Sequence, residues 1–248
     1  MEQKIGDHPI WHLPFLGNGP WASVHADTIL TTWIVMVVSL AFFAWIGASY
    51  RSNRVTKRQT TFEGLVNYIS DLAIGTIGRH GEAFVPFFIA LFVYIFLLNQ
   101  VGFLPFKQFG LPFGGSPTAD LNTTAAYAII VFVMINVVAV RRHGIKWYGH
   151  LAQPMWWLTP INMIEEIARP VTLALRLFFN IFVGEILIFV VATIIASHVM
   201  VGPVNLSLAA TIMPFFLQLF NFFIGTLQAF VFTLLTIVYL SAPLSDEH

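Results

Sequence analysis

The chain has 248 residues, of which 57% are hydrophobic and 10% are charged, and its mean hydropathy is +0.78. A soluble domain has about 25% charged residues, so this composition excludes an ordinary water-soluble domain, and it excludes a disordered chain as well. Twelve Lys and Arg balance twelve Asp and Glu, which leaves no basic excess for binding nucleic acid. The absence of Cys excludes disulfides and thiolate metal sites. The composition predicts a polytopic membrane protein.

Five apolar runs approach or exceed the roughly 20 residues that a transmembrane helix needs. They are Ile29–Ala48, Ala83–Leu104, Asn122–Val140, Ile161–Val201 and Ser207–Leu240. At about 1.5 Å per residue, the last run reaches about 51 Å, whereas the hydrocarbon core is about 30 Å thick. No turn cluster divides either of the last two runs, although they contain Pro170 and Pro214. We therefore expect two long helices, strongly tilted or kinked, joined by a turn at Gly202–Asn205.

Between the first two runs, apolar residues recur at helical spacing and polar residues fill the positions between them. The apolar set is Phe62, Leu65, Val66, Ile69, Leu72, Ala73 and Ile77, and the polar set is Glu63, Asn67, Ser70 and Asp71. This pattern predicts an amphipathic helix on the inner surface, docked on the membrane or on a partner. The expected fold class is an all-α membrane protein with about five transmembrane helices and this additional surface helix.

The distribution of Lys and Arg between the loops predicts the orientation of the chain. Loops expected outside carry few of these residues, namely Lys4 and Lys107. Loops expected inside carry most of them: Arg51, Arg54, Lys57, Arg58, Arg79, Arg141, Arg142 and Lys146. The N-terminus is therefore expected outside and the C-terminus inside. We expect one membrane domain, with an outer segment at 1–27, the first two spans within 28–104 and the last three within 105–248.

Five charged residues lie inside the fourth apolar run: Glu165, Glu166, Arg169, Arg176 and Glu185. A charge at the bilayer centre costs roughly 2.5–3.5 kcal/mol on insertion scales, and it is a functional candidate by default. At about 100° per residue, Arg169, Glu165 and Asn180 fall within about 40° of Arg176, whereas Glu185 lies on the opposite face. Arg176 and Glu185 therefore point toward different neighbours.

Each of these charges also has a structural interpretation. Glu165 and Arg169 suit an i,i+4 ion pair near the inner surface. Arg176 would instead form a bridge to a loop carboxylate, and Glu185 would pair with another helix.

The fifth run carries a stripe of neutral polar residues on one face, including Gln218, Asn221, Gly225, Gln228 and Thr236. Such a stripe serves either as interhelical hydrogen bonding or as the partner of the face that carries Arg176. In the loop before the third run, Asp120 and Asn122 either cap a helix or form a polar vestibule at the outer mouth. His198, near the outer end of the fourth run, is either a solvated interfacial residue or part of the same path.

The stretch Pro160–Ile188 reads PINMIEEIARPVTLALRLFFNIFVGEILI, and it closely resembles the signature of subunit a of rotary F-type ATP synthases. Two further stretches match in the expected order, SPTADLNTT at Ser116–Thr124 and TLQAFVFTLLTIVYLS at Thr226–Ser241. The resemblance covers most of the chain from about Thr61 onward. The chain departs from the family pattern at Phe179, where Gly is usual, and at Asn221, where several bacterial members have His.

This resemblance implies a stator that lies beside a ring of c subunits and forms two offset half-channels against it. Arg176 would be the essential fixed charge between the channels, and Asn180 and Gln228 would flank it. The remaining residues assigned to the proton path are Glu185, Asn221, Gln218, Asp120, Asn122 and His198 on the outer side, and Glu165 and Glu166 on the inner side. The implied partners are the c ring, peripheral-stalk b subunits, other synthase subunits and the bilayer, without a cofactor or metal. The implied location is a bacterial plasma membrane, or an organellar energy-coupling membrane.

Two other function classes remain as alternatives. A secondary ion or solute transporter often shows internal repeats, and we find none here. An intramembrane hydrolase or metal enzyme needs a Ser-His pair or several His within the spans, yet only His198 lies near a span end. The chain has no GxxxxGK[ST] phosphate loop, so we expect it to be non-catalytic, with ATP chemistry in partner subunits.

Overall fold

The structure is a computed structural model that describes residues 10–12, 23–49, 57–102, 116–144, 147–149, 155–196, 200–201 and 204–244. His198 and the segment 245–248 lie outside the described residues. The main elements are helices α1 (Ala26–Ser49), α2 (Lys57–Ile77), α3 (Val85–Val101), α4 (Leu121–His143), α5 (Thr159–Ala196) and α6 (Leu206–Leu244). Short 3-10 turns precede three of them: η3 (Arg79–Phe84), η5 (Pro117–Ala119) and η7 (Trp156–Leu158).

Two small strand pairs accompany these helices. Strands β1 (Ile10–His12) and β2 (Ser23–His25) pair antiparallel directly before α1. Strands β3 (Met200–Val201) and β4 (Val204–Asn205) pair antiparallel between α5 and α6. Of the predicted turn at Gly202–Asn205, Val204 and Asn205 form β4, whereas Gly202 and Pro203 lie outside the described residues. The class remains all-α.

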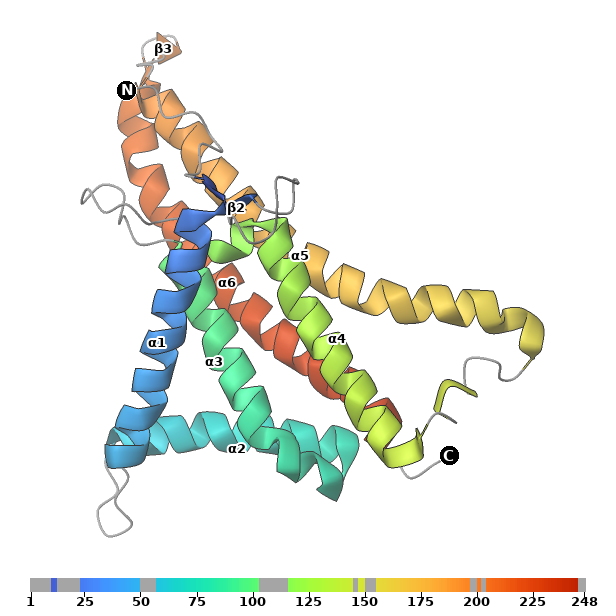
Figure 1. The fold of residues 1–248 in the computed structure, drawn as a ribbon. Coiled ribbons are helices and arrows are strands. Elements are labelled where there is room, and N and C mark those ends of the chain that lie inside the picture. Colours follow the sequence, from blue (N-terminus) through green and yellow to red (C-terminus); the bar gives the residue numbers. More distant parts are fainter. Residues whose placement is uncertain are drawn as a thin grey trace.

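Among the described residues, five helices are long and apolar enough to cross a membrane. Their spans are Asp27–Ala48, Arg79–Val101, Leu121–His143, Thr159–Val191 and Met213–Leu244. This confirms the five predicted spans. Figure 1 shows α1, α3 and α4 side by side, with α2 crossing one end of this group and α6 running obliquely behind it.

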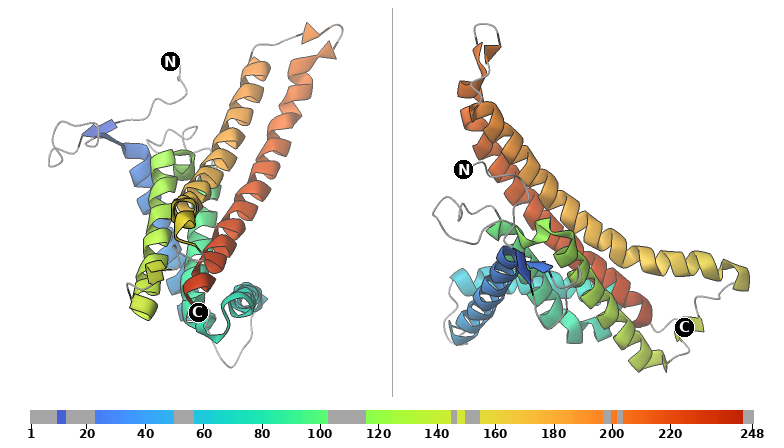
Figure 2. Two further views of the ribbon diagram at one scale, coloured as in Figure 1. Left: turned by 90° about the vertical axis from the view of Figure 1, so that its right-hand side faces the viewer. Right: turned by 45° about the horizontal axis from the view of Figure 1, so that its top comes forward.

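Helices α5 and α6 confirm the prediction of two long, undivided helices. They have 38 and 39 residues and continue through Pro170 and Pro214, so each is about 57–59 Å long at about 1.5 Å per residue. Figure 2 shows that α5 bends strongly and that the two helices lie side by side up to β3 and β4. A helix of this length spans a bilayer only when it is oblique or bent.

The predicted amphipathic helix is α2, but its apolar face has a different partner from those we expected. Ile69, Ala73 and Ile77 are buried in the common core, and α2 packs against α3, α6 and η3. Tyr68 contacts Phe230 of α6, with ring centroids 5.9 Å apart. The apolar stripe thus docks mainly on the chain's own helices, whose apolar side chains it contacts.

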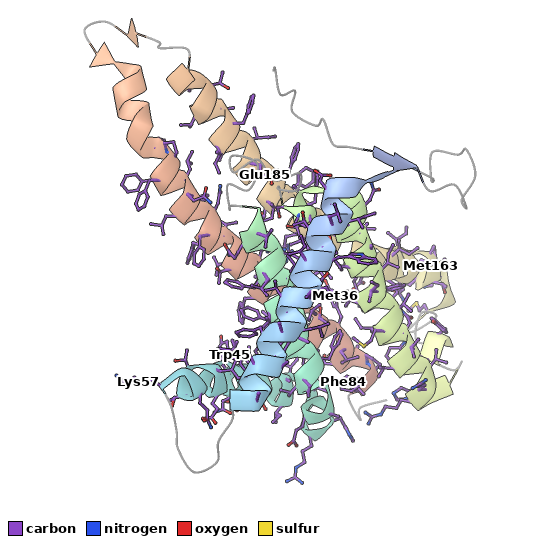
Figure 3. All side chains as sticks on the ribbon, turned by 60° about the vertical axis from the view of Figure 1, so that its left-hand side comes forward. Met36, Trp45, Lys57, Phe84, Met163 and Glu185 are labelled. Carbon is purple, nitrogen blue, oxygen red and sulfur yellow. The ribbon has the colours of Figure 1, made fainter. Side chains whose placement is uncertain are left out.

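The core lies between α3, α4, α6 and the middle of α5, and it includes residues of α1 and α2. Its fully buried side chains include Phe88, Leu98, Leu177 and Phe232. Large apolar residues such as Trp33 and Val37 remain exposed on α1, where Figure 3 also labels Met36 and Trp45. An apolar exterior around a packed interior is the arrangement that a lipid environment requires.

Candidate functional site

Arg176 lies in the middle of α5 on a face that the described residues leave exposed. The side chains of Phe179 and Val183 on this face are 52% and 48% exposed, while Leu173 and Leu177, on the adjacent bundle-facing side, are buried. Within the part of the chain that the structure describes, the Arg176 guanidinium makes no hydrogen bond or ion pair. The bridge to a loop carboxylate is therefore not found among the described residues.

Arg169, two turns earlier on nearly the same face, has close partners within its own helix. Its guanidinium lies 3.3 Å from the Glu165 carboxylate and 3.2 Å from that of Glu166. It also lies over the Tyr239 ring of α6, 5.6 Å from the centroid. The predicted Glu165–Arg169 pair is confirmed. Arg169 and Glu166 also line a small pocket between α4, α5 and α6, together with Phe132 and Tyr239.

Asn180 lies one turn after Arg176 and connects α5 to α6. Its Nδ2 donates a hydrogen bond to Gln228 Oε1 at 2.6 Å. Gln228 is 2% exposed, and its Nε2 has no hydrogen-bond partner among the described residues. The polar stripes predicted on α5 and α6 therefore meet at Asn180 and Gln228. The buried Gln228 Nε2 remains as a donor beside the face of α5 that carries Arg176.

Asn221 occupies the same face of α6, about two turns before Gln228. It is 3% exposed, and its Nδ2 donates to the Gly184 carbonyl of α5 at 3.3 Å. A Cβ on Gly184 would lie 2.7 Å from Asn221 Oδ1, so the glycine allows the amide to sit on the α5 backbone. Asn221 therefore contacts Gly184, which directly precedes Glu185 in the chain. An amide orders neighbouring groups but does not titrate.

Glu185 connects α5 to the segment before α4. Its Oε1 accepts a hydrogen bond from the Ser116 backbone N–H at 3.1 Å. Figure 3 labels Glu185 where α5 leaves the bundle. This partner is a backbone group outside the helices, whereas the sequence interpretation paired Glu185 with another helix.

Sequence reasoning missed a buried polar chain behind Ser116. The Ser116 hydroxyl contacts Thr118 Oγ1 at 2.6 Å, and Thr118 donates to Asn99 Oδ1 at 2.9 Å. Asn99 donates in turn to the Gly225 carbonyl of α6 at 2.9 Å, and the neighbouring Gln100 donates to the Phe222 carbonyl at 3.2 Å. Two adjacent amides inside an apolar span were the available signal, because buried amides need partners.

The residues that make these polar contacts fall within a match to a known family. The model of the family described as "ATP synthase A chain" matches residues 29–241. The chain belongs to this family. With five helices able to cross a membrane, it is an integral, multi-pass membrane protein. The predicted resemblance is confirmed, and the finding favours it over the transporter alternative.

Three curated members of the ATP synthase A chain family illustrate the similarity. The chain is 37% identical over 245 residues to ATP synthase subunit a of Desulforamulus reducens, covering 96% of this chain and 86% of the relative. It is 31% identical over 250 residues to that of Trichlorobacter lovleyi, covering 97% and 99%. It is 35% identical over 258 residues to that of Acidothermus cellulolyticus, covering 100% and 88%.

The remaining predicted site residues of this family member lie around the same helices. Asp120 caps α4, since its Oδ1 accepts from the Asn122 N–H at 3.0 Å. This supports the capping interpretation for Asp120, while Asn122 itself is exposed. Gln218 is partly buried on α6. Thr236 is fully buried, but its hydroxyl donates to the Phe232 carbonyl of its own helix at 2.9 Å.

Proposed function

We propose that this chain is the proton-translocating stator subunit of a rotary F-type ATP synthase, and that Arg176 is its essential fixed charge. The observation that carries the proposal is the exposed Arg176 side chain, which has no partner among the described residues and lies mid-span on an uncovered face of α5. A charge at this depth is costly, so it requires a counter-charge. On this proposal, the membrane carboxylate of a c subunit provides it.

The chemistry explains why the charge must be an arginine. A ring carboxylate that passes the stator has to ionise within the membrane, and a nearby positive charge favours its ionised form. The guanidinium stays protonated under these conditions, whereas a buried lysine loses its charge readily. The same fixed charge opposes direct passage of a proton between the two channels. The driving force is the transmembrane potential, about 2.3 kcal/mol per charge per 100 mV.

We assign the other polar groups to two half-channels, one on each side of the membrane. On the outer side, Glu185 is the titratable group, and Asn221 lies beside it on the Gly184 carbonyl. Asp120, Asn122, Gln218 and His198 would complete that path. On the inner side, Glu165 and Glu166 would line the exit, which is supported by the pocket that Glu166 and Arg169 line. Asn180 and Gln228 would orient water or the guanidinium between the two paths.

The proposed assembly follows from the family. Desulforamulus reducens and the other named relatives carry proteins called ATP synthase subunit a, so we assign this chain to the corresponding complex. Its partners would be a c-subunit ring along α5, peripheral-stalk b subunits and the remaining synthase subunits. It would lie in a bacterial plasma membrane with the N-terminus outside and the C-terminus inside. The chain itself would be non-catalytic.

The test is Arg176→Ala in the whole complex reconstituted in liposomes. ATP-driven acidification should be abolished, because no fixed charge then favours ionisation of the ring carboxylate. Thr172→Ala is the matched control, since Thr172 lies exposed on the same face and its hydroxyl bonds its own helix at the Ala168 carbonyl. Coupled pumping that survives Arg176→Ala would refute the proposal.

A further inference from the structure

The contact between Glu185 and Ser116 is held in place from several directions. The Ser116 N–H points at Glu185 Oε1, while its hydroxyl lies 3.2 Å from the Leu98 carbonyl and 2.6 Å from Thr118 Oγ1. Ser116 is 6% exposed and Thr118 is fully buried. Asn99, also fully buried, ties Thr118 to Gly225 of α6. The donor for Glu185 is therefore fixed to both α3 and α6.

Gly102, at the end of α3, makes this arrangement possible. A Cβ at Gly102 would lie 2.3 Å from Ser116 Cβ and 2.7 Å from both its Cα and its N. Two of these three atoms belong to the backbone, which cannot give way as the end of a flexible side chain can. The φ of Gly102 is −61°, so the glycine is needed for close approach and not for its backbone conformation. Any larger residue would move Ser116 away from α3.

We propose that the Ser116 backbone N–H is a positioning donor for the Glu185 carboxylate, and that Gly102 is the residue that allows Ser116 to reach it. The inference rests on the proposed function, in which Glu185 carries protons on the outer side. A backbone donor cannot rotate away as a hydroxyl can, and hydrogen bonds to charged groups are stronger than neutral ones. The contact therefore keeps the carboxylate facing one direction between successive protonations.

The backbone geometry of Ser116 allows a test that removes the N–H. Its φ is −75° and its ψ is 122°, which a proline adopts without strain. Ser116→Pro removes both the N–H and the hydroxyl, whereas Ser116→Ala removes the hydroxyl alone. The ratio of proton flux between the two variants therefore reports on the N–H. Flux is measured as acidification of liposomes that contain the complex, driven by a potassium diffusion potential and expressed per complex recovered with its c ring.

We expect Ser116→Pro to conduct about tenfold less than Ser116→Ala, the scale of a lost hydrogen bond to a charged group. Equal flux in the two variants would overturn the proposal. Ser116→Pro and Ser116→Ala are then each combined with Glu185→Asp, which withdraws the carboxylate by one methylene. There the Pro-to-Ala ratio should return to about one, and a ratio that stays tenfold would show that Ser116 acts on another group.

Gly102→Ala provides a second route that does not depend on proline. It should lower the flux in the same direction, and this loss too should shrink when combined with Glu185→Asp. Gly75→Ala is the matched control and should leave the flux unchanged, because nothing lies within 4 Å of a Cβ at that position. Normal flux in Gly102→Ala would contradict the proposal. Unchanged flux in Glu185→Asp and Glu185→Gln alone would instead refute the channel role of Glu185 in the proposed function, so the two failures are distinguishable.

Discussion

Arg169 and Arg176 lie seven residues apart on nearly the same face of α5, yet their surroundings differ completely. Arg169 has two carboxylates within 3.3 Å and an aromatic ring beneath it. Arg176 has no hydrogen bond or ion pair in the described parts of the chain and is exposed among apolar side chains. The chain neutralises the first arginine internally, and the proposed function assigns the second to a carboxylate of another subunit. On that proposal, the surroundings of the side chain, and not the residue type, separate a structural charge from a functional one.

The most direct way to break this comparison is to neutralise each arginine by the same substitution. Arg176→Gln should reduce ATP-driven proton pumping about 100-fold or more, because a nearby opposite charge changes the ionisation of a carboxyl group by about 10- to 1000-fold. Arg169→Gln should retain pumping within about threefold, since partly exposed ion pairs contribute little. Dye-monitored acidification of liposomes measures both. Similar losses in the two variants would contradict the distinction.

The carboxylates allow a second comparison along the same helix. Glu185→Gln should slow passive proton conduction about tenfold or more, because the amide cannot exchange a proton. Glu165→Gln should slow it less than Glu185→Gln does, because the Glu165 side chain is 67% exposed and water at the proposed inner exit can take over part of its role. The complex should remain intact in both variants. Conduction that is insensitive to Glu185→Gln across the pH range would refute the role of this residue.

The hydrogen bond between Asn180 of α5 and Gln228 of α6 allows a third test, because it links the arginine-bearing helix to its neighbour. In a double-mutant cycle with Asn180→Ala and Gln228→Ala, the pumping rates should show a coupling of about 0.6 kcal/mol, or roughly threefold, typical of hydrogen bonds between membrane helices. Each single variant should pump more slowly than the parent. Asn180→Ala removes the partner of the buried Gln228 amide, and Gln228→Ala removes the contact of the exposed Asn180 side chain with α6. Strictly additive effects would show that the 2.6 Å contact is irrelevant to pumping.

The smallest effect is expected at Thr236, which belongs to the same predicted polar stripe. Its hydroxyl bonds the Phe232 carbonyl of its own helix, so no other helix depends on it. Thr236→Val keeps the shape of the side chain, and we expect pumping and complex recovery within about 1.5-fold of the parent, consistent with the small worth of a bond inside one membrane helix. A large loss would mean that the stripe acts as a whole and not through Asn221 and Gln228.

Sequence reasoning predicted the elements better than it predicted the contacts. The five spans and the undivided α5 and α6 follow from the lengths of apolar runs, and the periodicity of the last two runs brought Asn180 and Gln228 to facing stripes. The contact of Glu185 with Ser116 could not be predicted, because its donor is a backbone N–H that any residue at position 116 except proline would supply. The docking of α2 on α3 and α6 also depends on tertiary packing, which the amphipathic pattern alone does not specify.

Hydrogen bonds from the ends of α4 and α3 hold α6 at two separate points along its length. Arg142 and His143 of α4 bond the Leu244 and Pro243 carbonyls, at 2.9 and 2.8 Å, while Asn99 and Gln100 bond α6 at Gly225 and Phe222. A helix that is held at two separated points resists rotation about its own axis as well as bending. Gln228 lies between these supports. Contacts with α3 and α4 therefore fix the direction in which Gln228 points. On the proposed function, a c ring turning past α5 would meet a Gln228 side chain that does not rotate with the ring.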